Sequence, residues 1–516
     1  MKALIVFLLI QTVNSHLNLL TATILELHNA LNSYEITSRQ LVELYLKRID
    51  DVNHKGPELN AVIEINPDAL EIAEQLDKER IKFNDKSRSL LHGIPILVKD
   101  NIATYDKLNT TCGSHALLGS KVPRDATVID RLKRAGAIIL GKTNLSEWAN
   151  FRSFNVTRDG WSARGGITRS AYIKDGSTYG SSSGSAVAAS IGLCAVALGT
   201  ETDGSIISPS SINNVVGLKP TVGLTSRSGV IPISHNQDSI GPIARTVMDA
   251  AILLETIQGM DQRDEATLNK NAVRHCNYIQ FCRGINGFHG LSLGVVRNLN
   301  YTAIPVDQLR TFNEAIHLMA KLGVKIIDPL NFESEDKLIN PLNELLILEI
   351  DFKHDIELYL RELNNTNMRT LNDLIKFNDE NPDKEFSQYT PDQGIWLESQ
   401  NSTIIPDSPL YRQILNTNLN LSRDGGIDYL LDKHHLDALV MLSDASTTPS
   451  AMAGYPIISV PLGYLTDEVP ENVVGRPYGI AFTGRAWSEN ILLTFADAFE
   501  KATNVRKRVI PVYAPV

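Results

Sequence analysis

The sequence has few of the features that mark disulfide-rich, membrane-spanning or nucleic-acid-binding proteins. Four cysteines in 516 residues are too few for a fold held together by disulfides. Beyond the first residues, no apolar run is long enough to cross a bilayer. The formal net charge is −10 and no basic run is present, which argues against a nucleic-acid partner. With 43% hydrophobic residues, the chain has the composition of a globular protein with a large core.

Patterns for metals and cofactors are also missing. His434 and His435 are adjacent but have no partners at metal-ligand spacing, so we expect no metal. Residues 136–143 fit the P-loop pattern, but the four residues between the glycines are Ala-Ile-Ile-Leu, which are typical of a strand. We therefore expect no nucleotide and no cofactor. Cys276 and Cys282 are close enough in sequence to form a disulfide, and the sequence leaves open whether they do.

The N-terminus has the pattern of a secretory signal peptide over residues 1–15. Lys2 precedes an apolar run at 3–10, and a polar stretch with small residues ends at Ser15. A buried N-terminal strand is the alternative, but the order of charge, apolar run and small residues favours the signal peptide. The mature chain, 16–516, would then be secreted or lie in the lumen of the secretory pathway.

Helices and short apolar strands alternate along the mature chain. A helix at 125–135 is followed by Gly136 and a strand at 137–140, and the same order recurs at 312–327. Further apolar strands are expected at 93–99, 291–296, 438–442 and 457–460. This alternation predicts an α/β fold whose sheet is covered on both faces. No linker divides the chain, so we expect one domain over 16–516, with a polar peripheral insertion at about 364–420.

The segment most suggestive of chemistry is rich in glycine and serine. Gly-Ser-Ser-Ser-Gly-Ser at 180–185 precedes a helix at 186–191, a strand at 193–198 and a polar turn at 199–205. A flexible linker is excluded because buried elements follow at once, whereas an anion-binding helix N-terminus stays possible. A serine nucleophile needs a neighbouring base, and a tight turn of small residues can direct several N–H groups at one oxyanion.

Lys99 is the candidate base. It ends the apolar run 94–98, where desolvation would lower its pKa and leave the amine neutral. Taken alone, a lysine at this place would more often pair with a neighbour such as Asp100. The interpretation of Lys99 as a base is therefore supported only in combination with the glycine- and serine-rich segment.

Several segments together resemble the amidase signature family. The resemblance rests on residues 92–100, 110–114, 141–148, 180–185, 199–205, 217–221, 454–461 and 487–489, and it extends from about residue 20 to near the C-terminus. It implies a single-domain fold in which a mixed β-sheet core is sandwiched between helices. It also implies hydrolysis of carboxamide C–N bonds through an acyl-enzyme.

The resemblance assigns roles by position. Ser205 would be the nucleophile, Ser181 the bridging serine after a cis peptide bond, and Lys99 the general base. Ser182 would support the relay by hydrogen bonding. The oxyanion hole would be formed by the backbone N–H groups of Thr202, Asp203, Gly204 and Ser205.

The turn at 200–205 resembles the branch that includes peptide amidases, as do the segments 161–166 and 225–232. Asp203 replaces a glycine common in the family, Ile207 replaces an arginine, and Tyr179 replaces a glycine. A carboxylate at Asp203 would disfavour anionic substrates, so neutral amides such as peptide C-terminal amides are expected. The alternatives are the synthetic subunit of a glutamine-dependent tRNA amidotransferase, a lipid amide hydrolase and a silent binding protein.

The signal peptide and the sequons generate the first prediction. Asn-X-Ser/Thr sequons stand at Asn109, Asn144, Asn155, Asn300, Asn364, Asn401 and Asn420. Expressed in a secretory host, the protein should begin near His16 and carry glycans on some of Asn300, Asn364, Asn401 and Asn420. Mass spectrometry of the purified protein measures both. An unglycosylated product that retains Met1 would contradict the prediction.

Overall fold

The computed structural model describes residues 17–83, 88–269, 276–299, 304–443, 445, 447–466 and 469–514. The predicted signal peptide at 1–15 and the sequon at Asn300 lie outside these ranges. Of the other sequon asparagines, Asn155, Asn364, Asn401 and Asn420 are exposed, Asn109 is half-buried and Asn144 is buried.

The described residues form one eleven-stranded mixed sheet and a separate two-stranded ribbon. In spatial order the large sheet contains β1 (Val62–Ile65), β3 (Ile138–Thr143), β2 (Pro95–Lys99), β6 (Val196–Glu201), β8 (Ser239–Ala244), β7 (Val216–Lys219), β12 (Ile457–Tyr464), β13 (Pro477–Thr483), β11 (Ala438–Leu442), β9 (Ser292–Val296) and β10 (Lys325–Leu330). The ribbon pairs β4 (Trp161–Ser162) with β5 (Gly166–Ile167). Strands β3, β2 and β6 run parallel, as do β11, β9 and β10, whereas β8, β7, β12 and β13 pair antiparallel with their neighbours.

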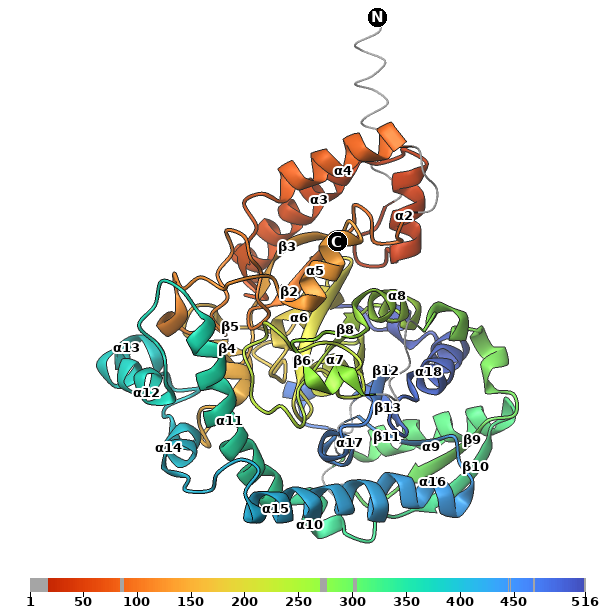
Figure 1. Cartoon of the computed structure of the whole chain (residues 1–516). Coiled ribbons are helices and arrows are strands. Elements are labelled where there is room, and N and C mark those ends of the chain that lie inside the picture. The colour runs from red at the N-terminus through yellow and green to blue at the C-terminus, as the bar shows by residue number, and fades with distance from the viewer. Residues whose placement is uncertain are drawn as a thin grey trace, which may run out of the picture.

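The central strands are buried on both faces because both faces of the sheet are covered. Every residue of β2, β3, β6, β8 and β11 is buried. Helices pack on the sheet from both sides, as Figure 1 shows. The predicted fold class, a mixed sheet between helices, is therefore confirmed.

One predicted strand differs from the observed one in a way that matters for the site. The sequence placed a strand at 193–198 and a polar turn at 199–205, whereas β6 spans Val196–Glu201. Gly199, Thr200 and Glu201 pair with β8, opposite Gly241, Ile240 and Ser239. The strand therefore carries polar side chains at its end, because ladder pairing with β8 outweighs their preference for a turn.

The helices, in chain order, are α2 (Ile24–Asn32), α3 (Ser38–Ile49), α4 (Ala69–Phe83), α5 (Thr127–Arg134), α6 (Ser183–Ser190), α7 (Ile207–Ile212), α8 (Val247–Ile257), α9 (Val306–Lys321), α10 (Glu335–Ile339), α11 (Leu342–Glu362), α12 (Leu371–Glu380), α13 (Pro382–Glu385), α14 (Gly394–Asn401), α15 (Pro409–Leu419), α16 (Asp428–His434), α17 (Thr448–Ala453) and α18 (Glu489–Thr503). The capping box expected before α3 is present, because Thr37 and Gln40 each accept the other's backbone N–H.

The predicted insertion at 364–420 contains α12 to α15, which lie with α11 along the flank of the sheet core (Figure 1). Trp396 on α14 anchors this segment. Its indole Nε1 donates to the carbonyl of Phe151 at 2.7 Å, and its ring meets that of Trp148 edge-on at 5.0 Å. Arg152 adds a bond from Nη1 to the Glu385 carbonyl at 2.6 Å.

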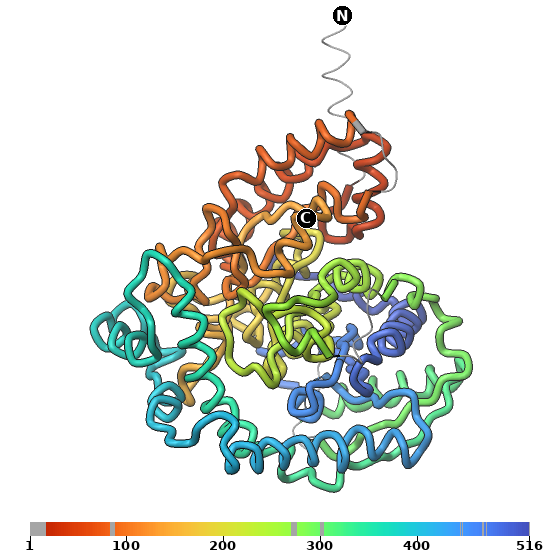
Figure 2. Tube along the Cα trace, viewed as in Figure 1, coloured from red at the N-terminus to blue at the C-terminus, as the bar shows by residue number. Residues whose placement is uncertain are grey.

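The C-terminal tail returns to the N-terminal helices, as Figure 2 shows. Arg48 Nη2 on α3 lies 3.3 Å from the carbonyl of Ala514. Within the described ranges, no helix is long and apolar enough to cross a membrane.

All four cysteines are free, so Cys276 and Cys282 are not bridged in this structure. Cys194 is a fully buried thiol, as the apolar run around it predicts.

Trp396 is fully buried, so its removal tests how the helical segment is held. Trp396→Ala should lower the free energy of unfolding by about 3–5 kcal/mol, because it leaves a cavity and an unpaired Phe151 carbonyl. Urea unfolding followed by circular dichroism measures the change. Leu397→Ala is the control, because Leu397 is 45% exposed. Equal losses in the two variants would contradict this anchoring role.

Candidate active site

Lys99 and the polar end of β6 are brought together by the register of two parallel strands. Leu97 pairs with Ala197 and Val98 pairs with Leu198, so Lys99 at the end of β2 lies beside the last residues of β6. The carboxyl ends of neighbouring parallel strands meet at one edge of the sheet. This edge is where the predicted site residues gather.

The Lys99 amine is surrounded by oxygens that carry no formal charge. Nζ lies 2.7 Å from Ser181 Oγ and 3.0 Å from Ser182 Oγ. It also lies 2.8 Å from Thr200 Oγ1 and 3.1 Å from the Thr200 carbonyl. Asn101 Nδ2 also donates to Thr200 Oγ1, at 3.0 Å, and helps to fix that hydroxyl.

Burial of this amine changes its proton affinity. Lys99 is fully buried, and desolvation lowers its pKa to about 7, although the charges of Glu201 and Asp238 partly oppose the shift. No carboxylate of the described chain forms an ion pair with it, so no such partner holds the ammonium form. Above that pH the neutral amine predominates and can accept a proton.

Ser181 and Ser182 lie in the turn that leads into α6. The Gly180–Ser181 peptide bond is cis, as the sequence resemblance implied. The turn is held to its neighbours by backbone bonds, from Ser146 N to the Ser181 carbonyl at 3.0 Å and from Ser182 N to the Ser205 carbonyl at 3.1 Å. Ser182 Oγ in turn donates to the Thr200 carbonyl at 3.1 Å.

The turn before α7 presents Ser205 with unused N–H donors. Gly204 has φ +79°, a left-handed conformation that glycine adopts without strain. The N–H groups of Thr202, Asp203, Gly204 and Ser205 have no acceptor among the residues that the structure describes. Ser205 is 8% exposed, so its hydroxyl is at the edge of the protein interior. Such a turn can hold an oxyanion.

Two carboxylates shape this turn. Glu201 Oε2 accepts the N–H groups of Ile206 at 2.6 Å and Ile207 at 2.9 Å, which closes the turn onto the start of α7. Asp203 accepts hydroxyl hydrogen bonds from Thr447 at 2.5 Å and Thr448 at 2.7 Å. The Asp203 carboxylate is thus directed toward the start of α17.

The structure brings the predicted site residues into one place, with one link left open. Lys99 contacts Ser181 and Ser182 directly, and Ser205 meets the same turn through its carbonyl. Within the described part of the chain, no hydrogen bond joins the hydroxyls of Ser181 and Ser205. In unliganded enzymes such contacts are often long and shorten when substrate binds.

Sequence reasoning gave no role to Thr200, Asn101 or Glu201. Thr200 and Glu201 belong to the segment 199–205 that carried the resemblance, and Asn101 follows Lys99 by two residues. Their polar side chains at the ends of buried strands were the signal that could have identified them. Their hydrogen bonds, however, depend on the register of the strands, which the sequence did not reveal.

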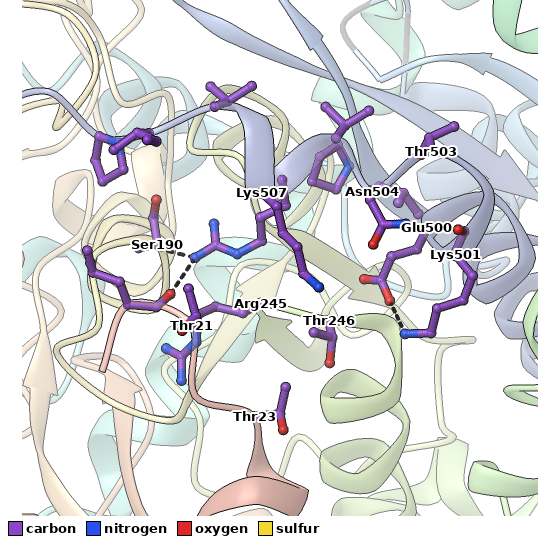
Figure 3. A pocket seen from close by; sticks show the side chains of 18 of the residues that line it. Thr21, Thr23, Ser190, Arg245, Thr246, Glu500, Lys501, Thr503, Asn504 and Lys507 are labelled. Carbon is purple, nitrogen blue, oxygen red and sulfur yellow. Dashed lines mark hydrogen bonds and ion pairs between the residues drawn. The ribbon is translucent and has the colours of Figure 1, made fainter. Parts of the chain in front are cut away.

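A cavity of about 550 Å³ lies away from these residues, between the N-terminal segment, the residues just before α8, the end of α18 and the C-terminal tail (Figure 3). Its charged residues are mostly engaged. Arg245 donates to the carbonyls of Ala22 and Cys194, and Lys501 bonds to Glu500 at 3.0 Å. We interpret it as a junction between chain ends.

Across the described residues, no group of three or more acidic, histidine or cysteine side chains is arranged to hold a metal.

Comparison with known proteins gives consistent results over most of the chain. A family model described as Amidase matches residues 40–424. A probable amidase of Arabidopsis thaliana is 44% identical, over 94% of this chain and 91% of that protein. The peptide amidase of Stenotrophomonas maltophilia is 38% identical with a TM-score of 0.87, over 95% of this chain and 98% of that one. A glutamyl-tRNA(Gln) amidotransferase component of Prochlorococcus marinus is 31% identical, over 94% and 97% of the two chains.

The Lys99 environment predicts a pH dependence. If the neutral amine is the base, kcat/KM for an activated acyl anilide should be level above pH 8 and fall about tenfold per pH unit below about 7, as Lys99 gains a proton. Lys99→Ala should lower turnover on the order of 10³- to 10⁵-fold. Lys47→Ala is the control, because that side chain is 72% exposed. A folded Lys99→Ala protein with near-normal turnover would rule out this role.

Proposed function

Because the chain belongs to the amidase family and is an amide-hydrolysing enzyme, we propose that it cleaves neutral carboxamides, in particular the C-terminal amides of peptides, through an acyl-enzyme on Ser205. The observation that carries the catalytic part is the buried Lys99 amine in contact with Ser181, next to a turn with unused N–H donors.

In the proposed first step, Ser205 Oγ attacks the amide carbonyl carbon. Its proton passes to Ser181 Oγ while the proton of Ser181 passes to Lys99 Nζ, which becomes an ammonium. The carbonyl oxygen becomes an oxyanion that accepts hydrogen bonds from N–H groups of the turn 202–205. The four contacts of Lys99 Nζ stabilise the transient ammonium without a permanent counter-ion.

In the second step, the C–N bond breaks and the leaving nitrogen takes a proton back through Ser181, so that ammonia departs. Lys99 is then neutral again. Water then attacks the acyl-enzyme, and its proton passes through Ser181 to Lys99. That proton returns to Ser205 Oγ as the acyl C–O bond breaks, so the carboxylic acid leaves and Ser205 is restored. Each proton that Lys99 accepts is returned within the same half-reaction.

The substrate class is supported by two features. The first is the likeness to the Stenotrophomonas peptide amidase over nearly the whole chain. The second is Asp203, whose carboxylate lies within the turn that would hold the oxyanion. A neutral carboxamide tolerates this charge, whereas a free carboxylate at the same place would be repelled. We therefore propose that the acid product leaves readily and that free acids bind weakly.

We also propose that the enzyme works in the secretory pathway or outside the cell. The support is the N-terminal pattern at 1–15 together with the exposure of the sequon residues Asn364, Asn401 and Asn420. Glycan transfer requires an exposed asparagine, and these three meet that condition.

A second candidate role is that of an amidotransferase component, which the likeness to the Prochlorococcus marinus protein favours. Proteins of that kind act on glutamyl-tRNA(Gln), as their name states. The acidic balance of this chain, with a net charge of −10, is unfavourable for an RNA partner. The free hydrolase is therefore the function that we propose.

One peptide in three forms tests the proposal: its C-terminal amide, its free acid and a chain extended beyond that residue. We expect ammonia release from the amide, at a rate at least about 100-fold above cleavage of the extended chain, with no reaction of the acid. Coupled ammonia detection and mass spectrometry measure the products. Equal cleavage of the amide and the extended chain would indicate an endopeptidase-like enzyme. Hydrolysis of long-chain acyl amides alone would indicate a lipid amidase.

A further inference from the structure

Two carboxylates beside the oxyanion turn have no counter-ion among the described residues. Asp203 belongs to the turn itself, and Glu344 comes from the first turn of α11. Gln237 links Glu344 to the same turn, because its Nε2 lies 2.7 Å from Glu344 Oε1 and 3.4 Å from the Thr202 carbonyl. The flanking helical segment thus places an acidic side chain next to the catalytic turn.

Glu344 is only half satisfied. It is 4% exposed, yet only its Oε1 accepts a hydrogen bond from a residue that the structure describes. Asp203 accepts from the Thr447 and Thr448 hydroxyls, which carry no charge. Glu344 Oε2 is not one of the fully buried oxygens that lack a partner, so it stays within reach of a ligand that supplies a donor.

The cations near this pair are engaged elsewhere. Lys219 Nζ donates to the carbonyls of Tyr455 at 2.8 Å and Pro220 at 3.3 Å, and burial lowers its pKa to about 8. Arg227 forms an ion pair with Asp264 at 2.7 Å. Across the part of the chain that the structure describes, no ion pair reaches either Asp203 or Glu344. A ligand can therefore supply the positive partner that these residues do not.

A second acidic group on α11 provides a contrast. Asp355 accepts from His235 Nδ1 at 2.9 Å, and Asp351 accepts from Ser234, Asn236 and Tyr411. That group is internally satisfied and ties α11 to the loop before β8. Of these three described carboxylates on α11, Glu344 is the one that keeps an oxygen without a donor.

Burial raises the pKa of Glu344 well above its usual range, and the charge of Asp203 raises it further. Burial also raises the pKa of Asp203. When one member of the pair carries a proton, the charge repulsion between the two carboxylates is removed. A bound cation would replace that proton and leave both carboxylates ionised.

Building on the proposed function, we propose that Asp203 and Glu344 select amides that carry a cationic side chain next to the scissile carboxamide, so that C-terminal lysinamides and argininamides are the preferred substrates. The ammonium or guanidinium group would donate to Glu344 Oε2 and offset the charge of Asp203. Because the N–H of Asp203 would also bind the oxyanion, neutralising its carboxylate favours the transition state as well as binding. The preference should therefore appear in kcat as well as in KM.

The test compares two peptides that differ only at the last residue, one ending in lysinamide and the other in Nε-acetyl-lysinamide. The acetyl group removes the charge and keeps the length of the chain. For the wild-type enzyme we expect kcat/KM to be at least about tenfold higher for lysinamide. Glu344→Gln should reduce this ratio to about threefold or less, since the amide keeps the bond to Gln237 but not the charge. Glu349→Gln, on the same helix, should leave the ratio unchanged.

Equal kcat/KM for the two amides in the wild-type enzyme would overturn the inference while leaving peptide amidase activity intact. A large ratio that Glu344→Gln does not change would overturn it too, because the cation would then be recognised elsewhere. Failure to hydrolyse either peptide amide would instead refute the proposed function, and the inference with it. Thermal unfolding of the Glu344→Gln protein checks that it is folded. If it is not, Glu344→Asp, which keeps the charge on a shorter side chain, is compared with the wild-type enzyme, and a ratio that this variant leaves unchanged would overturn the inference.

Discussion

The burial of the Lys99 amine, with no carboxylate partner among the described residues, is the constraint on which the catalytic arrangement depends. A lysine in water keeps its proton at neutral pH, and a buried lysine beside a carboxylate does so even more firmly. Here desolvation lowers the pKa to about 7, and the four contacts of Nζ are all to uncharged oxygens. The strand β2 imposes the burial, because every one of its residues is inside the sheet.

The rest of the site is organised around uncharged donors and acceptors at the same sheet edge. Thr200 and Ser182 hold the amine, while Glu201 closes the turn that displays Ser205. Glu201 and Asp238 act on the amine only at a distance, because neither is hydrogen-bonded to it, whereas Asp203 and Glu344 lie at the oxyanion turn. With the proposed selectivity for cationic amides, a neutral base and an acidic recognition pair would act within one active site.

The sequence predicts the fold class and those helices and strands that are determined by local signals. The strand at 438–442 and the capping box before α3 were predicted as they are observed, since apolar runs and cap chemistry are local signals. The roles of Lys99, Ser181 and Ser205 came from the resemblance, and their proximity then followed from the strand order. The extension of β6 through Thr200 and Glu201 could not be predicted, because it depends on pairing with β8. The approach of Glu344 depends on a tertiary contact with Gln237, more than one hundred residues away.

Labelling with a fluorophosphonate tests the central claim without knowledge of the substrate. In that reaction Ser205 Oγ bonds to phosphorus, fluoride leaves, and the serine proton passes through Ser181 to Lys99. The account predicts a single adduct on the peptide that contains Ser205, formed at a rate that rises with pH through about 7 and is nearly abolished in Lys99→Ala. An adduct on Ser181 or Ser182 with Ser205 unmodified would contradict the account. A labelling rate that is independent of Lys99 would contradict it as well.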